Sequence, residues 1–594
     1  MTPPRGEGAA DGGRDALLFA RQPRPGTLAR LCDAVAILAR HPAAAFAILR
    51  ARLAGKRVRA AQARAALLGL DHHGLTLTVR DRRIHGFLGA PGPVVEEADI
   101  VVLTAPGHTV PAGGIETFAR TFAAHPNRLA LYGDALDVSG DRIVPILRPA
   151  FDLDYLRAVD YVGPVVAVRR TALAAVGGFS TLHPEAPALD LVLRLAARFG
   201  VGAIGHLPLV LSVARDRTAI VRSLGTSVGP LAGGEGRADV GASAGDVPMR
   251  LSENRGRSGP YPAGEGGRGV RSARLAIVRQ TLDGAGQTAV DDRMGADGVI
   301  TLVRPLPEPA PRVSLIVPTR DRLDLLRPCL DSLIHRTAWP NTEILICDND
   351  SRDPETLAYL GDLTARGIAR VVPCPGPFDF AAMNNRAAAL ARGQLLAFVN
   401  NDVTATEPDW LDRMVREALR PDVGAVGARL VDGRGRIQHG GVILGPGGLV
   451  THAHRFFTGD APGYLSGLVA TRAVSAVTAA CLVVEARKFA DVGGFDSAAF
   501  AVDFNDVDLC LRLNRAGYRT LYVGGAVLIH DEAASRRWTA EALARHGREV
   551  AAFKKRWGPL LTQDPHYHPG FDPDLGTYAR LRSGWPGTGP AEPR

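Results

Sequence analysis

The sequence predicts an α/β fold with a mainly parallel sheet, and three observations lead to that prediction. From residue 313 onward, apolar strand patterns alternate with helical patterns in a βαβα order. Three of those strands end in polar residues, as strands at a ligand-binding sheet edge do. An earlier block, residues 96–215, repeats part of the same pattern at a long period, which indicates a duplicated domain rather than a solenoid.

The first two strands of the later block are apolar, and a polar turn follows each of them. Residues 313–317 lead into Pro318 and Thr319, and residues 343–347 lead into Asp348. The carboxyl ends of parallel strands share one edge of a sheet, so these polar residues should line one crevice. The helices expected between the strands cover residues 323–335, 354–366 and 380–392.

The most informative segment is a polar triplet after a fully apolar strand. Residues 395–399 form the strand, and Asn400, Asn401 and Asp402 follow at its carboxyl end. An aspartate delivered there can hold a hard divalent cation against the phosphates of a nucleotide. The triplet taken alone also fits a polar turn without a ligand.

A run of carboxylates then opens a predicted helix. Acidic residues favour helix N-termini for electrostatic reasons alone, so their presence does not by itself indicate catalysis. Asp508 begins the amphipathic run and is expected to serve capping or packing, whereas Asp506 can point into the crevice. Further on, a strand over 526–529 ends at His530, which is either a structural histidine or a metal ligand.

Residues 313–560 resemble a family 2 glycosyltransferase with the GT-A fold. The motifs follow the family's order over nearly the whole block, and they are VSLIVPTRDR, ICDNDS, FDFAAMNNRA, LAFVNNDV, VGGFD, FNDVDLCLR and LIHDEAASR. The subgroup that it resembles builds O-antigen, rhamnan and other cell-surface polysaccharides. Residues 437–441 and 557–567 are similar to that subgroup too.

The resemblance implies a nucleotide pocket. Pro318, Thr319 and Asp348 would line the nucleobase and ribose, and Asn400 and Asn401 stand at the first and middle positions of the family's Asp-x-Asp motif.

The resemblance also implies a metal site and a base. Asp402 matches the metal-binding aspartate of the motif, His530 matches a histidine that completes the metal and diphosphate site, and Asp506 matches the general base. Asn400 replaces a carboxylate of the family pattern, which puts the metal affinity in doubt. Asn505, where many relatives have Glu, is a tolerated variant.

The chemistry fits those roles. A sugar nucleotide needs its diphosphate leaving group stabilised, which Mg²⁺ or Mn²⁺ does as a Lewis acid. A carboxylate can remove the proton of an acceptor hydroxyl, and such general-base help is worth ~10²- to 10⁴-fold in rate. One direct displacement inverts the anomeric centre, so we expect an inverting transferase.

Two further residues are candidates for substrate contact. His439 lies in a Gln-His-Gly-Gly turn and can touch the donor or acceptor sugar, although a packing role fits it equally well. Asn385 precedes the nucleotide-edge strand by one helix, and capping or packing competes with ligand contact there.

The earlier block resembles the second half of a GT-A domain that has lost its chemistry. Residues 169–179 parallel residues 485–495, and an alignment of the two copies puts Pro106, Ala188 and Ser212 opposite Asp402, Asp506 and His530, respectively. We therefore expect a degenerate, non-catalytic GT-A-like domain that holds glycan, acts as a scaffold or forms an oligomer.

Composition sets the broad class. The chain has 594 residues, 46% hydrophobic and 22% charged, with a net charge of +9 and six cysteines that show no paired or metal-ligand spacing. This predicts a cytoplasmic, multidomain protein with reduced thiols and no secretory signal or membrane span. Residues 34–64 are apolar and basic and can pack as an ordinary helix or lie on the inner membrane surface.

The expected divisions are 1–95 (helical, basic), 96–215 (degenerate domain), 216–272 (flexible linker), 273–312 (helix-strand connector), 313–560 (catalytic domain) and 561–594 (tail).

Three functions compete. The first is a transferase that uses a UDP- or dTDP-sugar and a glycan acceptor, for which a polyprenyl-linked acceptor is suggested by analogy. The second is a nucleotidyltransferase, which would want a Gly-rich, Lys-containing phosphate loop that residues 318–321 do not form. The third is a catalytically silent glycan-binding scaffold. No aromatic-interleaved basic patch supports nucleic-acid binding.

Overall fold

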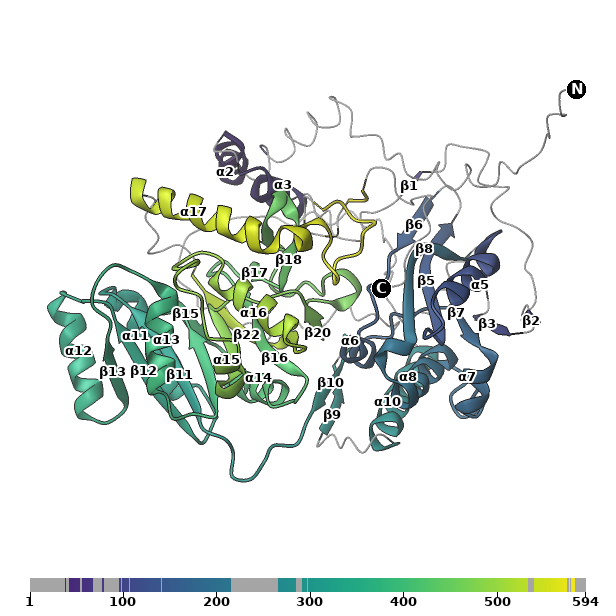
Figure 1. Cartoon of the computed structure of the whole chain (residues 1–594), viewed down its shortest axis with the longest axis horizontal. Coiled ribbons are helices and arrows are strands. Elements are labelled where there is room, and N and C mark those ends of the chain that lie inside the picture. The colour runs from purple at the N-terminus through teal and green to yellow at the C-terminus, as the bar shows by residue number, and fades with distance from the viewer. Residues whose placement is uncertain are drawn as a thin grey trace, which may run out of the picture.

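A computed structural model of the chain describes residues 38, 42–53, 56–67, 77–78, 96–97, 99–105, 107–139, 142–214, 265–284, 291–295, 297–531, 539–573, 576, 578 and 580–582. Two sheets lie side by side, and helices α2 and α3 lie on the outer edge near α17 (Figure 1). The prediction of an α/β fold with a related earlier domain is confirmed.

The larger sheet has the strand order β13-β12-β11-β14-β21-β16-β22-β15. Its first half is wholly parallel, and its second half mixes parallel and antiparallel pairs. The strands are β11 (Val313–Thr319), β12 (Thr342–Asp348), β13 (Ala369–Pro373), β14 (Leu395–Val399), β15 (Val403–Ala405), β16 (Val423–Val431), β21 (Cys481–Glu485) and β22 (Arg519–His530); β17 (Ile437–His439) and β20 (Thr471–Val474) pair at its side.

Helices cover both faces of this sheet. Every residue of β11 and β14 is buried, which explains why both strands are apolar without alternation. Asp353 and Asp379 cap two of the helices, each accepting a hydrogen bond from a backbone N–H of the first turn at 2.8 Å. The helices are α11 (Leu323–His335), α12 (Pro354–Ala365), α13 (Phe380–Leu390), α14 (Trp410–Ala418), α15 (Ala486–Asp491), α16 (Asn505–Arg515) and α17 (Ala540–Trp557).

The first domain repeats the second half of that sheet strand for strand. The pairs β3–β7, β5–β7 and β4–β8 are antiparallel and β5–β8 is parallel, as are β14–β21, β16–β21, β15–β22 and β16–β22, respectively. Where β14 pairs with β11, β3 pairs with the two-residue strand β2. The elements are β1 (Leu77–Thr78), β2 (Glu96–Glu97), β3 (Ile100–Thr104), β4 (His108–Thr109), β5 (Ala130–Ser139), β6 (Arg142–Ile146), β7 (Val165–Arg169) and β8 (Ile204–Ala214), with α5 (Gly114–Ala124), α6 (Leu153–Ala158), α7 (Arg170–Ala175) and α8 (Pro187–Phe199).

The strand registers correct the predicted alignment of the two copies. Ile100 pairs with Arg169 as Leu395 pairs with Glu485, which puts Gly107 opposite Asp402; Pro106 itself lies outside the described residues. Ala214 pairs with His108 as His530 pairs with Val403, so Ala214, and not Ser212, is the counterpart of His530. The alignment slipped because it assumed equal spacing between helix and strand, and α8 runs for 13 residues where α16 runs for 11. Neither Gly107 nor Ala214 can bind a metal ion through its side chain.

The boundary between linker and connector also differs from the prediction. Helix α10 (Glu265–Gly284) begins inside the predicted linker and is longer than the short helix expected over 272–282. Its residues Ile277, Val278 and Leu282 are buried in the core of the first domain, so tertiary packing extends the helix beyond its local pattern. Strands β9 (Asp291–Met294) and β10 (Ile300–Val303) follow as an antiparallel pair. Residues 216–264 lie outside the described part of the chain.

Candidate functional site

The carboxyl ends of β11, β12 and β14 bring the predicted nucleotide residues together. Thr319 and Asp348 are register partners on neighbouring parallel strands, and Pro318 precedes Thr319 on β11. The amide nitrogen of Asn401 donates to Thr319 Oγ1 at 3.1 Å. Ser351 N–H donates to Asp348 Oδ1 at 3.2 Å, which holds that carboxylate at the edge.

A second set of polar residues ties the loops of this edge to one another, and the sequence reasoning missed it. Asp321 Oδ1 accepts hydrogen bonds from the N–H groups of Arg352 (2.6 Å) and Asp353 (2.8 Å). The side-chain nitrogen of Asn349 donates to the carbonyls of Cys374 (2.7 Å) and Gly376 (3.0 Å). Clusters of Asp and Asn directly after two strands were the available signal, because these residues hydrogen-bond nearby backbone in turns.

Asp402 and His530 meet at the end of β22. His530 Nε2 lies 3.2 Å from Asp402 Oδ1, and the side chains are 6% and 8% exposed. The neighbouring backbone fixes them, since Val403 is the register partner of His530 and Asp531 N–H donates to the Asp402 carbonyl at 3.1 Å. Within the described residues, no hydrogen bond reaches Asp402 Oδ1, and His530 Nε2 is the ring nitrogen that lies beside it. This spacing of a buried carboxylate oxygen and an imidazole nitrogen suits a divalent cation, whose ligands sit at ~2.0–2.2 Å and hence about 3 Å apart.

Asp506 lies beside this pair. Ala479 N–H donates to Asp506 Oδ2 at 3.1 Å, and the next residue, Ala480, accepts from Asn400 N–H at 3.0 Å. One short loop before β21 therefore holds both the Asp506 carboxylate and the start of the polar triplet. Burial raises the pKa of Asp506 above its usual value, which makes it a better proton acceptor.

Asp508 has the packing role that its position predicts. Its side chain is fully buried and accepts hydrogen bonds from Arg512 Nε (2.7 Å), Arg556 Nη1 (2.8 Å) and Trp557 Nε1 (2.9 Å). All of these donors belong to helices α16 and α17. The two carboxylates on this helix turn therefore have different surroundings. Asp508 accepts from side chains of the core, whereas Asp506 accepts from the loop before β21.

The two predicted substrate contacts have close partners within the protein. The Asn385 amide donates to the Phe495 carbonyl at 2.8 Å and accepts from Phe495 N–H at 2.9 Å, which favours packing over ligand contact. His439 is fully buried, and its Nδ1 lies 2.7 Å from Nδ1 of His452 on β19 (Val450–His452). Burial, the His452 ring and nearby cations hold the pKa of His439 well below its usual value, so the ring is neutral.

His452 is a residue that the sequence did not single out. Burial, helped by Arg455 and His530, lowers its pKa to about 3. Two neutral imidazoles that share one hydrogen bond need one donor and one acceptor, so the tautomer of His452 fixes that of His439. No spacing in the sequence signals this pair, because β17 and β19 come together only in the fold.

A separate buried cluster, Asp134, His206 and His568, places three possible metal ligands within 4.8 Å of one another. Hydrogen bonds and close ion-pair contacts connect its members. Gly570 N–H donates to His568 Nδ1 at 2.8 Å, so the proton of a neutral ring sits on Nε2, which lies 2.9 Å from Asp134 Oδ2. Arg148 N–H and His206 complete the shell of Asp134 at 2.8 and 3.2 Å. We read this cluster as a buried carboxylate held between two imidazole rings and one backbone N–H.

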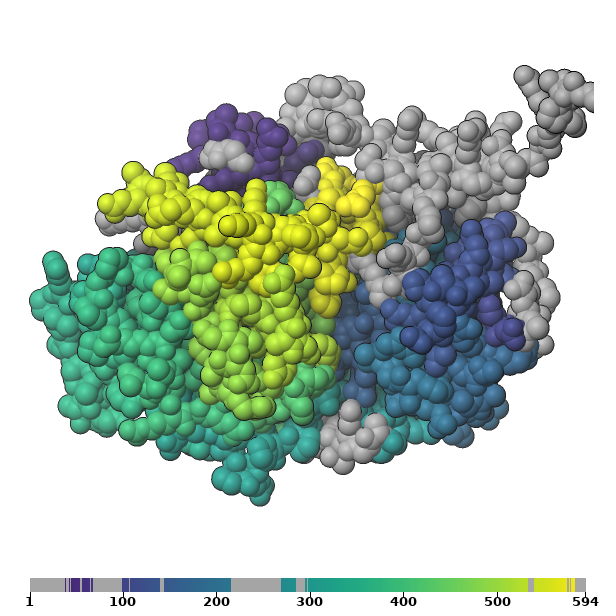
Figure 2. Space-filling model, in the orientation of Figure 1, coloured from purple at the N-terminus to yellow at the C-terminus, as the bar shows by residue number. Residues whose placement is uncertain are grey.

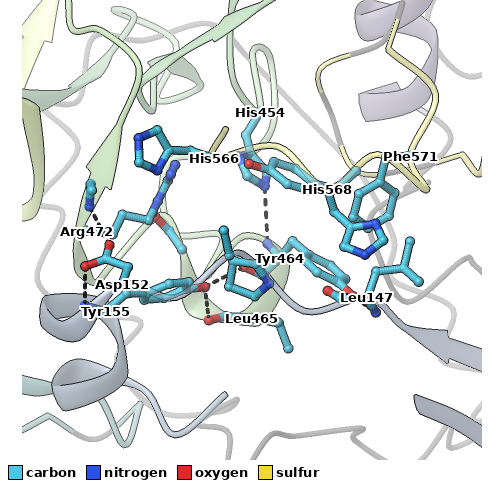
Figure 3. Close-up of a pocket in the computed structure, with 15 residues that line it drawn as sticks. Leu147, Asp152, Tyr155, His454, Tyr464, Leu465, Arg472, His566, His568 and Phe571 are labelled. Carbon is cyan, nitrogen blue, oxygen red and sulfur yellow. Dashed lines mark hydrogen bonds between the residues drawn. The ribbon is translucent and has the colours of Figure 1, made fainter. Parts of the chain in front are cut away.

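A cavity opens at the seam between the two domains (Figure 3). Figure 3 shows the Tyr155 hydroxyl donating to the Leu465 carbonyl and Tyr464 N–H donating to His454 Nε2, at 2.6 and 3.2 Å. The walls combine the first domain, the catalytic domain and the C-terminal tail, and the lining side chains are Leu147, Pro149, Ala150, Asp152, Tyr155, His454, Tyr464, Leu465, Arg472, Ala473, His566, His568, Phe571 and Tyr578. The rings of His454 and Tyr464 each stack on the ring of Tyr578. We therefore assign the cavity to the packing between the two domains.

Residues 314–452 match the model of the family described as "Glycosyl transferase family 2". The chain carries a family 2 glycosyltransferase domain. The match covers the strands β11 to β14, with Thr319, Asp348 and the Asn400–Asp402 triplet, and reaches β19.

Five cysteines of the described residues are buried and free, as predicted for reduced thiols.

Curated relatives extend the likeness beyond the family 2 domain. The chain is 34% identical over 460 residues to "Uncharacterized protein y4gI" of Sinorhizobium fredii (strain NBRC 101917 / NGR234), covering 75% of this chain and 45% of the relative. It is 34% identical over 475 residues to "O-antigen biosynthesis protein RfbC" of Myxococcus xanthus, covering 79% and 34%, respectively. It is 39% identical over 83 residues to "N-acetylglucosaminyl-diphospho-decaprenol L-rhamnosyltransferase" of Mycobacterium tuberculosis (strain CDC 1551 / Oshkosh), covering 14% and 27%. The chain thus spans less than half the length of these relatives.

Among the described helices, none combines the length and the apolar character that crossing a bilayer requires.

Proposed function

We propose that this chain is an inverting, metal-dependent glycosyltransferase that moves a sugar from a UDP- or dTDP-sugar to a hydroxyl of a glycan acceptor in cell-surface polysaccharide biosynthesis. The observation that carries the proposal is the buried Asp402–His530 pair, 3.2 Å apart at the strand edge that also holds Thr319 and Asp348. The family 2 match and the likeness to an O-antigen biosynthesis protein support the same reaction class.

Asp402 and His530 would hold the cation, Mg²⁺ or Mn²⁺. When bound, the cation stabilises the charge that develops on the diphosphate leaving group. Thr319, Asp348 and Asn401 orient the nucleoside at the parallel edge, where Asn401 already hydrogen-bonds Thr319.

Asp506 acts as the base. Its Oδ2 is held by Ala479 N–H, which leaves carboxylate lone pairs to accept the proton of the acceptor hydroxyl as that oxygen attacks the anomeric carbon. The nucleoside diphosphate leaves from the opposite side, so the anomeric configuration inverts. His439, oriented by His452, would contact a sugar hydroxyl as a neutral group through Nε2, which no hydrogen bond from the described residues reaches.

The acceptor of this proposal is a polyprenyl-linked glycan, which would place the enzyme at the cytoplasmic face of the membrane. The likeness to a relative whose name includes a diphospho-decaprenol acceptor supports that choice.

The testing experiment measures nucleotide release from UDP-, dTDP- and GDP-sugars with Mn²⁺ or Mg²⁺, comparing wild type with Asp402→Ala. We expect metal-dependent release from one donor, reduced by ~10² or more in the variant. Asp362→Ala is the matched control, because Asp362 forms an exposed ion pair on α12 with Arg366 and should leave release unchanged. Equal release by wild type and Asp402→Ala would reject the metal site. Nucleotide binding without turnover, even with lipid-linked acceptor, would favour the silent scaffold.

A further inference from the structure

Helix α2 (Pro42–Leu53) exposes three large apolar side chains. Phe46, Leu49 and Leu53 are 74%, 52% and 81% exposed. Their spacing of three and four residues puts all three on one face of the helix. Ala44, Ile48 and Ala51 lie on the partly covered side, toward α3 (Arg57–Leu67). A helix that packs only within a protein keeps a stripe of such large apolar groups inside.

The exposed apolar face has a basic border. Residues 42–67 contain no Asp or Glu, and their cations are Arg50, Arg52, Lys56, Arg57, Arg59 and Arg64. On the helical wheel, Arg50 and Arg52 flank the stripe of Phe46, Leu49 and Leu53 on either side. Arginines in such positions extend their charged ends to the level of lipid headgroups while the apolar side chains between them enter the acyl boundary.

The helix pair is fixed to the catalytic domain. Gln62 of α3 is 1% exposed and donates to Thr451 Oγ1 at 3.1 Å and to the His452 carbonyl at 3.3 Å. The Arg59 guanidinium lies 5.7 Å from the centre of the Phe456 ring. Both contacts join α3 to the segment that carries His452, the partner of His439. Helix α2 packs against α3 and so lies near a candidate sugar contact. Figure 2 shows α2 and α3, in purple, on the outer edge of the molecule.

The geometry points to α2 as a docking surface for an anionic phospholipid membrane, with Phe46, Leu49 and Leu53 inserted at the interface and the arginines among the headgroups. A second copy of the chain is a poorer occupant. A two-fold contact would bring the same basic border against itself, which is electrostatically unfavourable. The function of this surface rests on the proposed use of a lipid-linked acceptor, but the binding itself does not.

The experiment is co-sedimentation of the full chain with vesicles of phosphatidylcholine alone or mixed with phosphatidylglycerol, at low and high salt. We expect binding to the anionic vesicles that weakens with salt. The triple variant Phe46→Ser/Leu49→Ser/Leu53→Ser should lower the partition coefficient by about tenfold or more. The double variant Arg50→Gln/Arg52→Gln should bind less tightly and with less dependence on salt.

The matched control is Leu182→Ser/Leu357→Ser, two leucines that are 70% and 45% exposed elsewhere, and it should bind as wild type does. Equal binding by the triple variant and this control would overturn the proposal. A dimer in light scattering that only the triple variant loses would assign the face to a second copy and overturn it too. Donor hydrolysis is measured alongside: unchanged hydrolysis in the triple variant separates a membrane effect from a failure of the proposed transferase.

Discussion

At the scale of single residues, Asp506 and Asp508 show how position on a helix divides similar side chains between chemistry and packing. Asp508 accepts from three side-chain donors in the core, whereas Asp506 accepts from the backbone N–H groups of Ala479 and Val507. The raised pKa of Asp506 has a thermodynamic consequence. A folded-state pKa above the unfolded value means that the folded protein binds the proton more tightly, so stability falls as pH rises through that window.

Asp506→Asn should therefore lower kcat by ~10²- to 10⁴-fold while leaving the protein as stable as wild type, or more stable, at neutral pH. Asparagine keeps an oxygen that can accept from Ala479 N–H and removes the charge that burial disfavours. The measurement is kcat together with Tm between pH 4 and pH 8. If the Tm of wild type exceeds that of the variant at any pH, it should do so only at the acid end of this range, where Asp506 is protonated.

Asp508→Asn is the control for that substitution. It should lower Tm markedly, because Arg512 and Arg556 would lose a charged acceptor in the core. A drop in Tm for Asp506→Asn as large as that for Asp508→Asn would contradict the crevice position of Asp506.

At the scale of elements, the internal repeat of the sequence forms the same ion pair and hydrogen bonds in both domains. We call this set of contacts the clasp. Arg512 pairs with Asp508 at 2.7 Å and donates to the carbonyls of Val492 and Gly494, at 2.5 and 2.7 Å. In the first domain, Arg194 pairs with Asp190 and reaches the carbonyls of Val176 and Gly178, at 2.6 and 3.0 Å. The clasp joins the turn after one helix to the next helix in both copies.

The glycines of the clasp are required by the backbone. Gly493 and Gly494 have φ of 80° and 67°, and Gly177 and Gly178 have φ of 83° and 77°. Side chains other than glycine rarely adopt this left-handed region. The repeated Val-Gly-Gly-Phe motif is therefore explained by folding, although it survives in the family signature of a catalytic domain.

Arg194→Met should cost about 3 kcal/mol of unfolding free energy, because it removes the ion-pair partner of the buried Asp190. Arg512→Met should cost less, because Asp508 keeps Arg556 and Trp557 as donors. The two variants should differ in function. Arg512→Met disturbs α16, which carries Asp506, and should lose turnover, whereas Arg194→Met should keep nucleotide binding and metal-dependent release. Urea unfolding and donor hydrolysis measure both effects. Loss of donor hydrolysis in folded Arg194→Met would show that the first domain shapes the catalytic site.

At the scale of the whole molecule, the degenerate domain and the catalytic domain share an ionic joint. Asp154 is 4% exposed and pairs with Arg519 at 2.8 Å, Arg420 at 3.0 Å and Arg304 at 3.3 Å. Burial alone would raise the pKa of Asp154, but Arg420, Arg519 and Arg304 together lower it well below its usual value. Asp152 adds a hydrogen bond from Ala473 N–H at 2.6 Å. Buried ion pairs thus fix the first domain against the domain that carries Asp402 and Asp506.

The C-terminal tail closes this joint through the Asp134 cluster. Burial would raise the pKa of Asp134, yet His568 and His206 lower it to about 2. A folded pKa below the unfolded value of 3.8 contributes stability above pH 4 that is lost as pH falls toward 2. We expect Asp134→Asn to remove about 2 kcal/mol of stability at pH 6, and the gap to wild type to shrink below pH 4. Urea unfolding at several pH values measures the gap. A constant gap from pH 6 to pH 3 would contradict the histidine-stabilised carboxylate.

The sequence by itself determined the elements and most of the candidate site. The strands β11 and β14 and the helix α11 were predictable because burial on both faces and amphipathic spacing are properties of neighbouring residues. Thr319, Asp348 and Asp402 could be placed at one edge because parallel strands share their carboxyl ends.

Only the tertiary structure decided what depends on register and depth. The counterparts of Asp402 and His530 in the first domain are Gly107 and Ala214, which only the strand registers reveal. The extra length of α8 that shifts Ala214 leaves no periodic signal. His452 meets His439 because two short strands approach each other. The exposure of Phe46 and the burial of Asp506 likewise depend on what packs against each helix, and packing partners distant in the chain are set by the fold rather than by the local pattern.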